Sequence, residues 1–255
     1  MSPASSAGSW TVPVVGGVLA GATASALATR WLEGRRTINR HVDDYRAHWG
    51  QRPDGAEGQL RYVALGDSAA QGVGATAVTR GYVPRIAERL RTASGREVLV
   101  TNLSVSGATS DDVVRDQLPQ FAELGFVPDL VTLDIGGNDV IYPGHNAATF
   151  ERSLDRILAA LPAGSFVADV PWFMVPVLAG QSQRMSVLAA ALVERQGHHL
   201  VPLHRVSRQT GKLGYHRHTA GDFFHPNDRG YEGWAEAFWG AIVASGRLEQ
   251  LRVEA

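Results

Sequence analysis

Four short blocks of the chain carry the residue types that acyl transfer needs. In chain order they are Gly66-Asp67-Ser68, the segment 102–109 around Gly107, Gly136-Gly137-Asn138-Asp139 and Asp222-Phe223-Phe224-His225. They supply a hydroxyl nucleophile, amide donors for a developing oxyanion, and an imidazole base with a carboxylate close by in the sequence. Together these groups predict a site that transfers or hydrolyses an acyl group.

Ser68 is the predicted nucleophile, His225 the predicted base and Asp222 its orienting carboxylate. A serine hydroxyl attacks slowly until a base takes its proton, and histidine is the side chain best suited to that task near neutral pH. The short step from Asp222 to His225 lets the carboxylate lie beside the ring, fix its tautomer and stabilise the imidazolium. Pro226 disfavours helix at His225, which is consistent with a defined turn there.

The predicted oxyanion hole consists of the backbone N–H of Ser68, the backbone N–H of Gly107 and the side-chain amide of Asn138. Glycine lets a substrate approach the chain closely, and an asparagine amide offers two donors. Asp67 and Asp139 belong to the same blocks. We expect them to hold loops by hydrogen bonding rather than to transfer protons.

Alternating strand and helix patterns position these blocks. The predicted strands are 62–65, 98–103, 130–135, 166–170 and 199–203, and the predicted helices are 31–48, 82–90, 110–117, 147–161 with Asn146 as its N-cap, 182–196 and 231–244. Such alternation is typical of a parallel sheet covered by helices on both faces. The first three blocks follow the carboxyl ends of the first three strands, where the loops of a parallel sheet converge on a ligand.

These blocks resemble those of the SGNH hydrolase family, also called GDSL esterases and lipases, from about residue 60 to the last helix. The resemblance identifies Ser68, Gly107, Asn138 and His225 with the four residues of the family's name, and Asp222 with the triad acid. It implies a flavodoxin-like three-layer α/β/α sandwich with a five-stranded, mostly parallel sheet, and serine hydrolysis of esters, thioesters or acetylated sugars. The expected mechanism needs no cofactor. Ala69 departs from the family pattern, which has leucine there. The more familiar Gly-x-Ser-x-Gly elbow of α/β-hydrolases does not occur in the chain.

Composition excludes several other classes of protein. The 255 residues are 44% hydrophobic and 19% charged, which suits a globular α/β domain. The net charge of −1, with both signs interspersed, gives no basic face for nucleic acid. The absence of cysteine excludes disulfides and thiolate metal sites. A histidine-rich stretch, residues 198–218, lacks convincing ligand spacing, so we expect no metal site.

The chain divides into three predicted parts, namely an apolar segment 1–30, a helix and linker 31–59, and the hydrolase domain 60–255. Residues 11–29 are barely long enough to span a membrane, their Gly, Thr and Ser content makes the segment a weak anchor, and arginines follow them directly. We therefore expect association with a membrane or the cell envelope, on a side that the sequence does not fix. Secretion after cleavage and a cytoplasmic location are the alternatives. Nothing in the sequence indicates an oligomeric state.

The expected function is hydrolysis of carboxylic esters through an acyl-serine intermediate, with a small-molecule or lipid ester of short to medium acyl chain as substrate. A deacetylase or acyltransferase acting on cell-envelope glycans or lipids is an alternative, and a catalytically silent envelope-binding protein is another. Gly-Asp-Ser alone is an ordinary turn sequence, so the prediction depends on all four blocks together. Residues 172–175 follow the fourth predicted strand and could line an acyl pocket.

Overall fold

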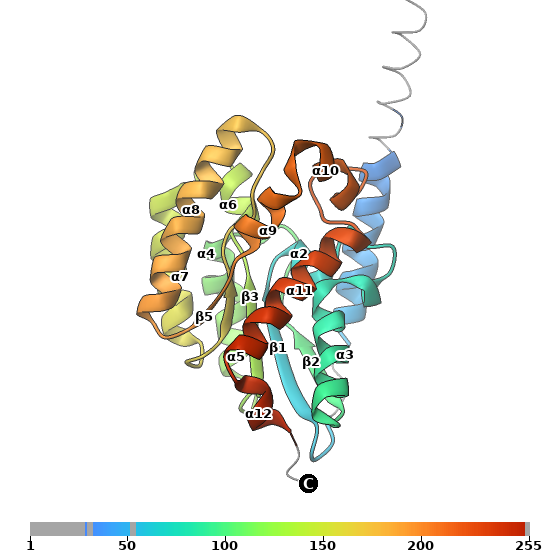
Figure 1. Cartoon of the computed structure of the whole chain (residues 1–255), viewed down its shortest axis with the longest axis vertical. Helices are drawn as coiled ribbons and strands as arrows, with labels where there is room; N and C mark the ends of the chain where they lie inside the picture. Colours follow the sequence, from blue (N-terminus) through green and yellow to red (C-terminus); the bar gives the residue numbers. More distant parts are fainter. Residues whose placement is uncertain (1–28, 30–32, 52–54, 253–255) are drawn as a thin grey trace, which may run out of the picture.

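A five-stranded parallel sheet lies at the centre of the computed structural model, which describes residues 29, 33–51 and 55–252 (Figure 1). In the spatial order β2-β1-β3-β4-β5, its strands are β2 (Val98–Asn102), β1 (Leu60–Gly66), β3 (Leu130–Asp134), β4 (Phe166–Ala168) and β5 (His199–Val201). Ala64 of β1 pairs with Asn102 on one side and with Thr132 on the other. After β1 the chain continues to one side of the sheet and after β3 to the other, so the switch point lies between these two strands.

Helices cover both faces of the sheet, which confirms the predicted three-layer sandwich. Along β1, Tyr62 and Ala64 belong to one apolar cluster and Val63 and Leu65 to the other, as the alternation of side chains in a strand requires. The face that carries Tyr62 and Ala64 is covered by α3 (Tyr82–Ser94), α11 (Asp228–Ala244) and α12 (Arg247–Leu251). The face that carries Val63 and Leu65 is covered by α4 (Ser110–Asp112), the π-helix η2 (Val113–Gln117), α5 (Leu118–Ala122), α7 (Ala147–Ala160) and α8 (Pro176–Arg195).

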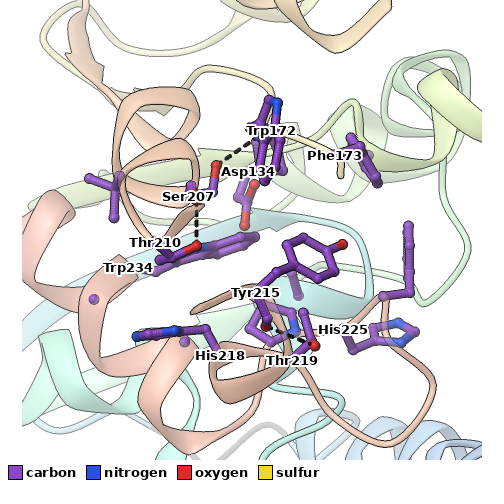
Figure 2. A pocket seen from close by; sticks show the side chains of 18 of the residues that line it. Asp134, Trp172, Phe173, Ser207, Thr210, Tyr215, His218, Thr219, His225 and Trp234 are labelled. Atoms are coloured by element: carbon purple, nitrogen blue, oxygen red, sulfur yellow. Dashed lines mark hydrogen bonds between the residues drawn. The ribbon is translucent and has the colours of Figure 1, made fainter. Parts of the chain in front are cut away.

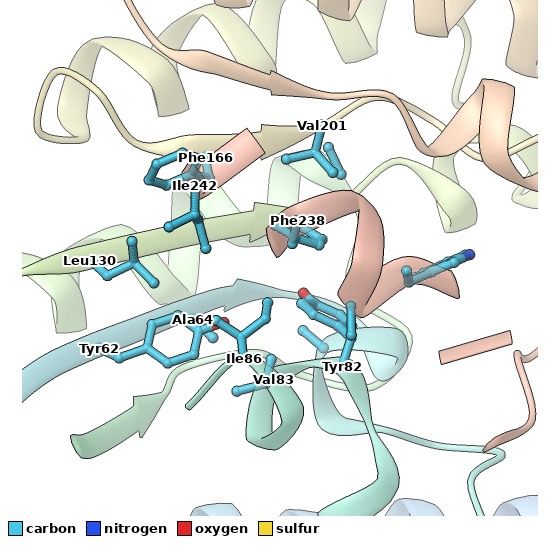
Figure 3. Close-up of a cluster of buried hydrophobic side chains, with 14 of the residues drawn as sticks. Tyr62, Ala64, Tyr82, Val83, Ile86, Leu130, Phe166, Val201, Phe238 and Ile242 are labelled. Carbon is cyan, nitrogen blue, oxygen red and sulfur yellow. The ribbon is translucent and has the colours of Figure 1, made fainter. Parts of the chain in front are cut away.

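Aromatic packing joins α3 and α11 over the sheet (Figure 3). The rings of Tyr82 and Phe238 are stacked with centroids 4.8 Å apart, and Tyr62 and Ile86 are fully buried in the same cluster. Burying one large apolar side chain contributes about 1.5–3 kcal/mol to folding. This packing fixes α11 relative to β1. The block Gly66-Asp67-Ser68 follows β1 and the block from Asp222 to His225 precedes α11, so the packing also helps to bring these two blocks together.

Two helices begin earlier than the sequence patterns predict. Helix α8 begins at Pro176 rather than at residue 182, because proline fits the first helical position, where its missing N–H would have no partner in any case. Helix α11 begins at Asp228 rather than at residue 231, because Asn227 caps it by accepting the N–H of Arg229. The predicted N-cap Asn146 of α7 is confirmed, since its side chain accepts the N–H groups of residues 148 and 149.

Several short helices escaped prediction because segments of one or two turns have no measurable amphipathic period. They include α2 (Ser68–Gln71), η1 (Val78–Arg80), α6 (Gly137–Ile141), α9 (Leu203–Gln209), α10 (Gly211–His218) and α12. Helices α2 and α6 directly follow β1 and β3, and α9 and α10 lie between β5 and α11 in the sequence. These elements carry much of the wall of the site.

The helix formed by residues 33–49 packs on the domain near α3 and is drawn in blue in Figure 1. Its Ile38 and Tyr45 are buried with Val73 in a small apolar cluster. Residues 1–28, 30–32, 52–54 and 253–255 lie outside the described part of the chain, so membrane contact through residues 11–29 stays a prediction. Within the described residues, no helix combines the length and the apolar character needed to cross a membrane.

Candidate active site

Ser68 is the first residue of α2, directly after the turn that ends β1. Gly66 has a φ of +144°, and a Cβ there would collide with the carbonyl oxygen of Asp134 on β3, so the turn requires glycine. Asp67 caps α2, because its Oδ1 accepts the N–H of Ala69 at 2.9 Å. Ser68 thus lies at a helix N-terminus, where its own backbone N–H has no partner within the helix.

The ring of His225 bridges Ser68 and Asp222, although 157 positions separate the serine from the histidine. Its Nε2 lies 2.9 Å from Ser68 Oγ, and its Nδ1 lies 2.6 Å from Asp222 Oδ2. An ionised carboxylate can only accept, so Nδ1 carries the proton and Nε2 is left to accept from the serine hydroxyl. The structure thus brings the three predicted catalytic residues into one hydrogen-bonded relay.

A tight turn from Asp222 to His225 fixes this relay. Asp222 Oδ1 accepts the backbone N–H groups of Phe224 and His225, both at 3.1 Å, while Oδ2 accepts from the ring. Phe223 has a φ of +58°, in the left-handed region that costs a non-glycine residue about 1–2 kcal/mol. The N–H of Ala220 donates to the His225 carbonyl at 2.7 Å and closes the turn.

Asp222 has the charge state that the relay needs. Burial alone would raise the pKa of its carboxyl, but the hydrogen bond and charge of His225 and the two backbone donors outweigh burial and lower the pKa below its ordinary value. The carboxylate therefore stays negative at neutral pH. In that state it stabilises an imidazolium on the neighbouring ring.

Gly107 and Asn138 border an open groove that Ser68 and His225 also line. Gly107 follows β2 and has a φ of +84°, which glycine adopts without strain. Asn138 is the second residue of α6, and its Nδ2 donates to the carbonyl of Ala108 at 2.8 Å. Among the described residues, the one other hydrogen bond of Nδ2 is a long one of 3.4 Å to Asp67 Oδ2, weak enough for the second amide hydrogen to turn to an oxyanion.

Replacing Asn138 by alanine is expected to lower kcat on an ester roughly 100- to 1,000-fold with little change in KM, as loss of one oxyanion donor has done in another serine hydrolase. The donor acts on charge that is present only in the transition state, so ground-state binding is hardly affected. Steady-state kinetics on the purified variant measure both constants, and a thermal melt checks that the protein folds. A fall in kcat of less than about tenfold would exclude this role.

Asp67 and Asp139 hold the loops of the site, as expected from the sequence. Asp139 accepts the backbone N–H of Ser110 at 2.9 Å and the Ser110 hydroxyl at 2.5 Å. These bonds tie the start of α4 to α6, which carries Asn138. Neither carboxylate shares a hydrogen bond with Ser68 or His225 among the described residues.

Two hollows meet at Ser68 and His225. The more enclosed is a cavity of about 210 Å³, bordered by the aromatic rings of Trp172, Tyr215 and Trp234 (Figure 2). Trp172 packs edge-on against Tyr215 with ring centroids 6.0 Å apart, and this contact joins the chain after β4 to α10. The other hollow is a more open groove of about 530 Å³, bordered by the predicted oxyanion donors and by the helix of residues 33–49.

Part of this wall could be found from the sequence and part could not. The sequence marks segment 172–175 as a candidate pocket wall, and Trp172 and Phe173 do line the enclosed cavity. Tyr215 was missed because α10 itself has no clear sequence signal, and Trp234 reads as an ordinary core residue of α11. The groove residues of helix 33–49 were missed because that helix precedes the domain in the sequence.

Asp134, the last residue of β3, also borders the enclosed cavity. Burial, and then the nearby charges of Asp67 and Asp169, raise the pKa of its carboxyl well above the ordinary value. Its Oδ2 has no hydrogen-bond partner among the described residues. Burial in this wall therefore favours the neutral acid over the carboxylate.

The histidines of segment 198–218 make separate local contacts. The His198 Nε2 lies 3.0 Å from the carbonyl of Leu158, and the His204 Nδ1 lies 3.0 Å from that of Val170. Within the described residues, no group of three or more His, Cys, Asp or Glu side chains is placed to hold a metal ion.

A sequence model of the GDSL-like lipase/acylhydrolase family matches residues 64–232, which is more than half of the chain. The chain belongs to this family. The match includes the four sequence blocks and confirms the resemblance to SGNH hydrolases. Membership makes the protein a serine carboxylic ester hydrolase of the SGNH class. The helix of residues 33–49 lies outside the matched family region.

Solved structures share the fold. The structure of TesA superposes with a TM-score of 0.59 at 23% identity and covers 72% of this chain and 98% of its own. LAE5, an alpha/beta hydrolase enzyme from the metagenome of Lake Arreo, gives 0.58 at 25% identity, covering 74% and 96%. Axe2, an acetylxylan esterase from Geobacillus stearothermophilus, gives 0.59 at 21% identity, covering 73% and 96%. Among curated proteins, none matches the sequence.

Proposed function

We propose that the protein hydrolyses carboxylic esters of short to medium acyl chain through an acyl-serine intermediate on Ser68. The observation that carries this proposal is the relay from Ser68 Oγ to His225 Nε2 at 2.9 Å and from His225 Nδ1 to Asp222 at 2.6 Å, next to Gly107 and Asn138. Nucleophile, base, orienting carboxylate and oxyanion donors are the groups that ester hydrolysis by a serine requires.

The reaction proceeds in two halves. Ser68 Oγ attacks the ester carbonyl while its proton passes to His225 Nε2, and the N–H groups of Ser68 and Gly107 with the Asn138 amide bind the oxyanion. The C–O bond to the alcohol then breaks, and the alcohol leaves with the proton from His225. Water next gives a proton to His225 and attacks the acyl carbon. Collapse of this second oxyanion returns the proton to Ser68 and releases the acid.

The two hollows have different roles in this scheme. The acyl group stays bound through both halves, which suits the more enclosed cavity beside Trp172 and Tyr215. The alcohol must leave and water must enter at the same position near His225, which suits the open groove. A cavity of roughly 150 Å³ holds benzene, so by proportion this cavity of about 210 Å³ has room for an acyl group of about eight carbon atoms.

A series of p-nitrophenyl esters from acetate to palmitate tests the acyl assignment. We expect kcat/KM to be highest near hexanoate and octanoate and to fall about tenfold or more at palmitate, because longer chains exceed the cavity. Trp172→Ala enlarges the cavity and is expected to move the optimum toward longer chains. Val177→Ala, at a side chain that is 79% exposed, is the matched control and should leave the optimum unchanged.

An optimum at palmitate would contradict the proposed acyl length and indicate a lipase. An optimum at acetate, with esters of longer acyl chains hardly hydrolysed, would also contradict the proposed acyl length, because the preferred chain would then be shorter than proposed. That result would favour deacetylation of glycans, for which the same three residues would serve. Axe2, one of the similar structures, is named as an acetylxylan esterase.

A further inference from the structure

We propose that the helix of residues 33–49, which lies outside the matched family region, forms one wall of the leaving-group site and selects the alcohol of the ester. The inference rests on the proposed function, since it assigns the open groove to the alcohol. It adds a specificity-determining element that neither the family match nor the sequence blocks contain.

Hydrogen bonds of three side chains of this helix, those of His41, Tyr45 and Trp49, help to hold it on the domain. Tyr45 Oη donates to the carbonyl of Ala75 at 2.8 Å, Trp49 Nε1 donates to that of Gln71 at 3.0 Å, and the N–H of Gly74 donates to a ring nitrogen of the helix, His41 Nδ1, at 3.4 Å. All three partners lie in α2 or in the loop after it, and α2 begins with Ser68. The helix is therefore fixed relative to the nucleophile.

Close backbone contacts also join the helix to the segment that carries the base. A Cβ on Gly34 would lie 2.6 Å from the carbonyl carbon of Gly221, the residue before Asp222. In the loop after α2, a Cβ on Gly74 would collide with the Pro226 carbonyl oxygen and lie 2.9 Å from His225 Cβ. Only glycine permits both approaches, so the helix, this loop and the turn of His225 form one packed unit.

One face of the helix borders the groove. Arg35, Ile38, Asn39 and Val42 line it opposite the catalytic residues. Their spacing of i, i+3, i+4 and i+7 is that of a single helix face. Ile38 is buried and Val42 half-buried, whereas the Asn39 side chain is exposed to the groove.

The groove face of helix 33–49 lies where the leaving group of the substrate binds. The groove contains Ser68, Gly107, Asn138 and His225, so a group that occupies it lies against the oxyanion donors and the ring that protonates the leaving oxygen. An acyl group held in the enclosed cavity leaves only the alcohol to fill this space. The helix therefore contacts the alcohol, and its side chains limit the size of alcohol that binds productively.

Two hexanoate esters that differ only in the alcohol test the inference. In the full chain, Asn39→Trp is expected to lower the ratio of kcat/KM for benzyl hexanoate to that for ethyl hexanoate about tenfold or more, because the indole fills the groove. Val42→Ala, which widens the groove, is expected to raise the same ratio. Ala47→Trp introduces the same indole at an exposed position of the helix that does not line the groove, and should leave the ratio unchanged.

This ratio does not depend on the fraction of folded enzyme, so a poorly folding variant still gives a valid result. An unchanged ratio in Asn39→Trp and Val42→Ala, with both esters hydrolysed, would overturn the inference alone. An equal fall in Ala47→Trp would overturn it as well. Failure of the wild type to hydrolyse either ester would instead contradict the proposed function.

Discussion

Replacement of Ser68 by alanine is expected to lower kcat on p-nitrophenyl hexanoate about a million-fold, the loss seen when the nucleophile of another serine hydrolase is removed. The hydroxyl is the group that bonds to the acyl carbon, and its contact with His225 Nε2 at 2.9 Å shows that a base is in place to take its proton. Without the hydroxyl, the oxyanion donors and substrate binding still accelerate attack by water roughly 1,000- to 10,000-fold over the uncatalysed reaction. Initial rates at high enzyme concentration measure this residual activity.

The fold should survive this change, because the Ser68 hydroxyl bonds only to the His225 ring among the described residues. A thermal melt of the variant should therefore match that of the wild type. Ser245→Ala, at the far end of α11, removes another serine hydroxyl that bonds to a helix carbonyl and should keep full activity. Retention of more than about one per cent of wild-type kcat in Ser68→Ala would contradict the assignment.

Replacement of His225 by alanine is expected to cost about as much as replacement of Ser68, because nucleophile and base act as one unit. Asp222→Asn keeps the shape of the orienting group but loses its charge, and is expected to lower kcat roughly 10,000-fold. The ionised state of Asp222 follows from its lowered pKa and its hydrogen bond to His225 Nδ1 at 2.6 Å. Steady-state rates should therefore be lowest and nearly equal in Ser68→Ala and His225→Ala, and higher in Asp222→Asn.

The double variant Ser68→Ala/His225→Ala separates a coupled relay from two independent effects. In a relay, the second substitution adds almost nothing to the first, since the base has no proton to take. Independent contributions would instead multiply, and the double variant would fall far below either single variant. Multiplicative losses would contradict the relay.

Much of the fold and the placement of the four blocks could be predicted, because both depend on local signals. Strand β3 is a β-branched apolar run that ends just before Gly136, and the parallel topology then dictates which loops converge. The turn from Asp222 to His225 was likewise visible in its spacing and in the proline that follows. These features involve residues that are close in sequence or at equivalent strand ends.

The walls of the two hollows could not be predicted, because they depend on contacts between distant segments. Tyr215 faces Trp172 only because α10 packs against the chain that follows β4, and α10 contains two glycines that weaken its helical pattern. The groove face of helix 33–49 has a helical spacing that is plain in the sequence. Which surface it would cover depends on the approach of Gly34 to Gly221, which no local pattern shows.

Reaction with a fluorophosphonate, followed by mass spectrometry of the peptides, tests most directly whether Ser68 is an activated nucleophile. Only a serine whose proton can be taken by a base reacts readily with this reagent. We expect one covalent adduct per chain, located on Ser68, and loss of labelling in both Ser68→Ala and His225→Ala. An unlabelled wild-type protein, or an adduct on a different residue, would contradict the account.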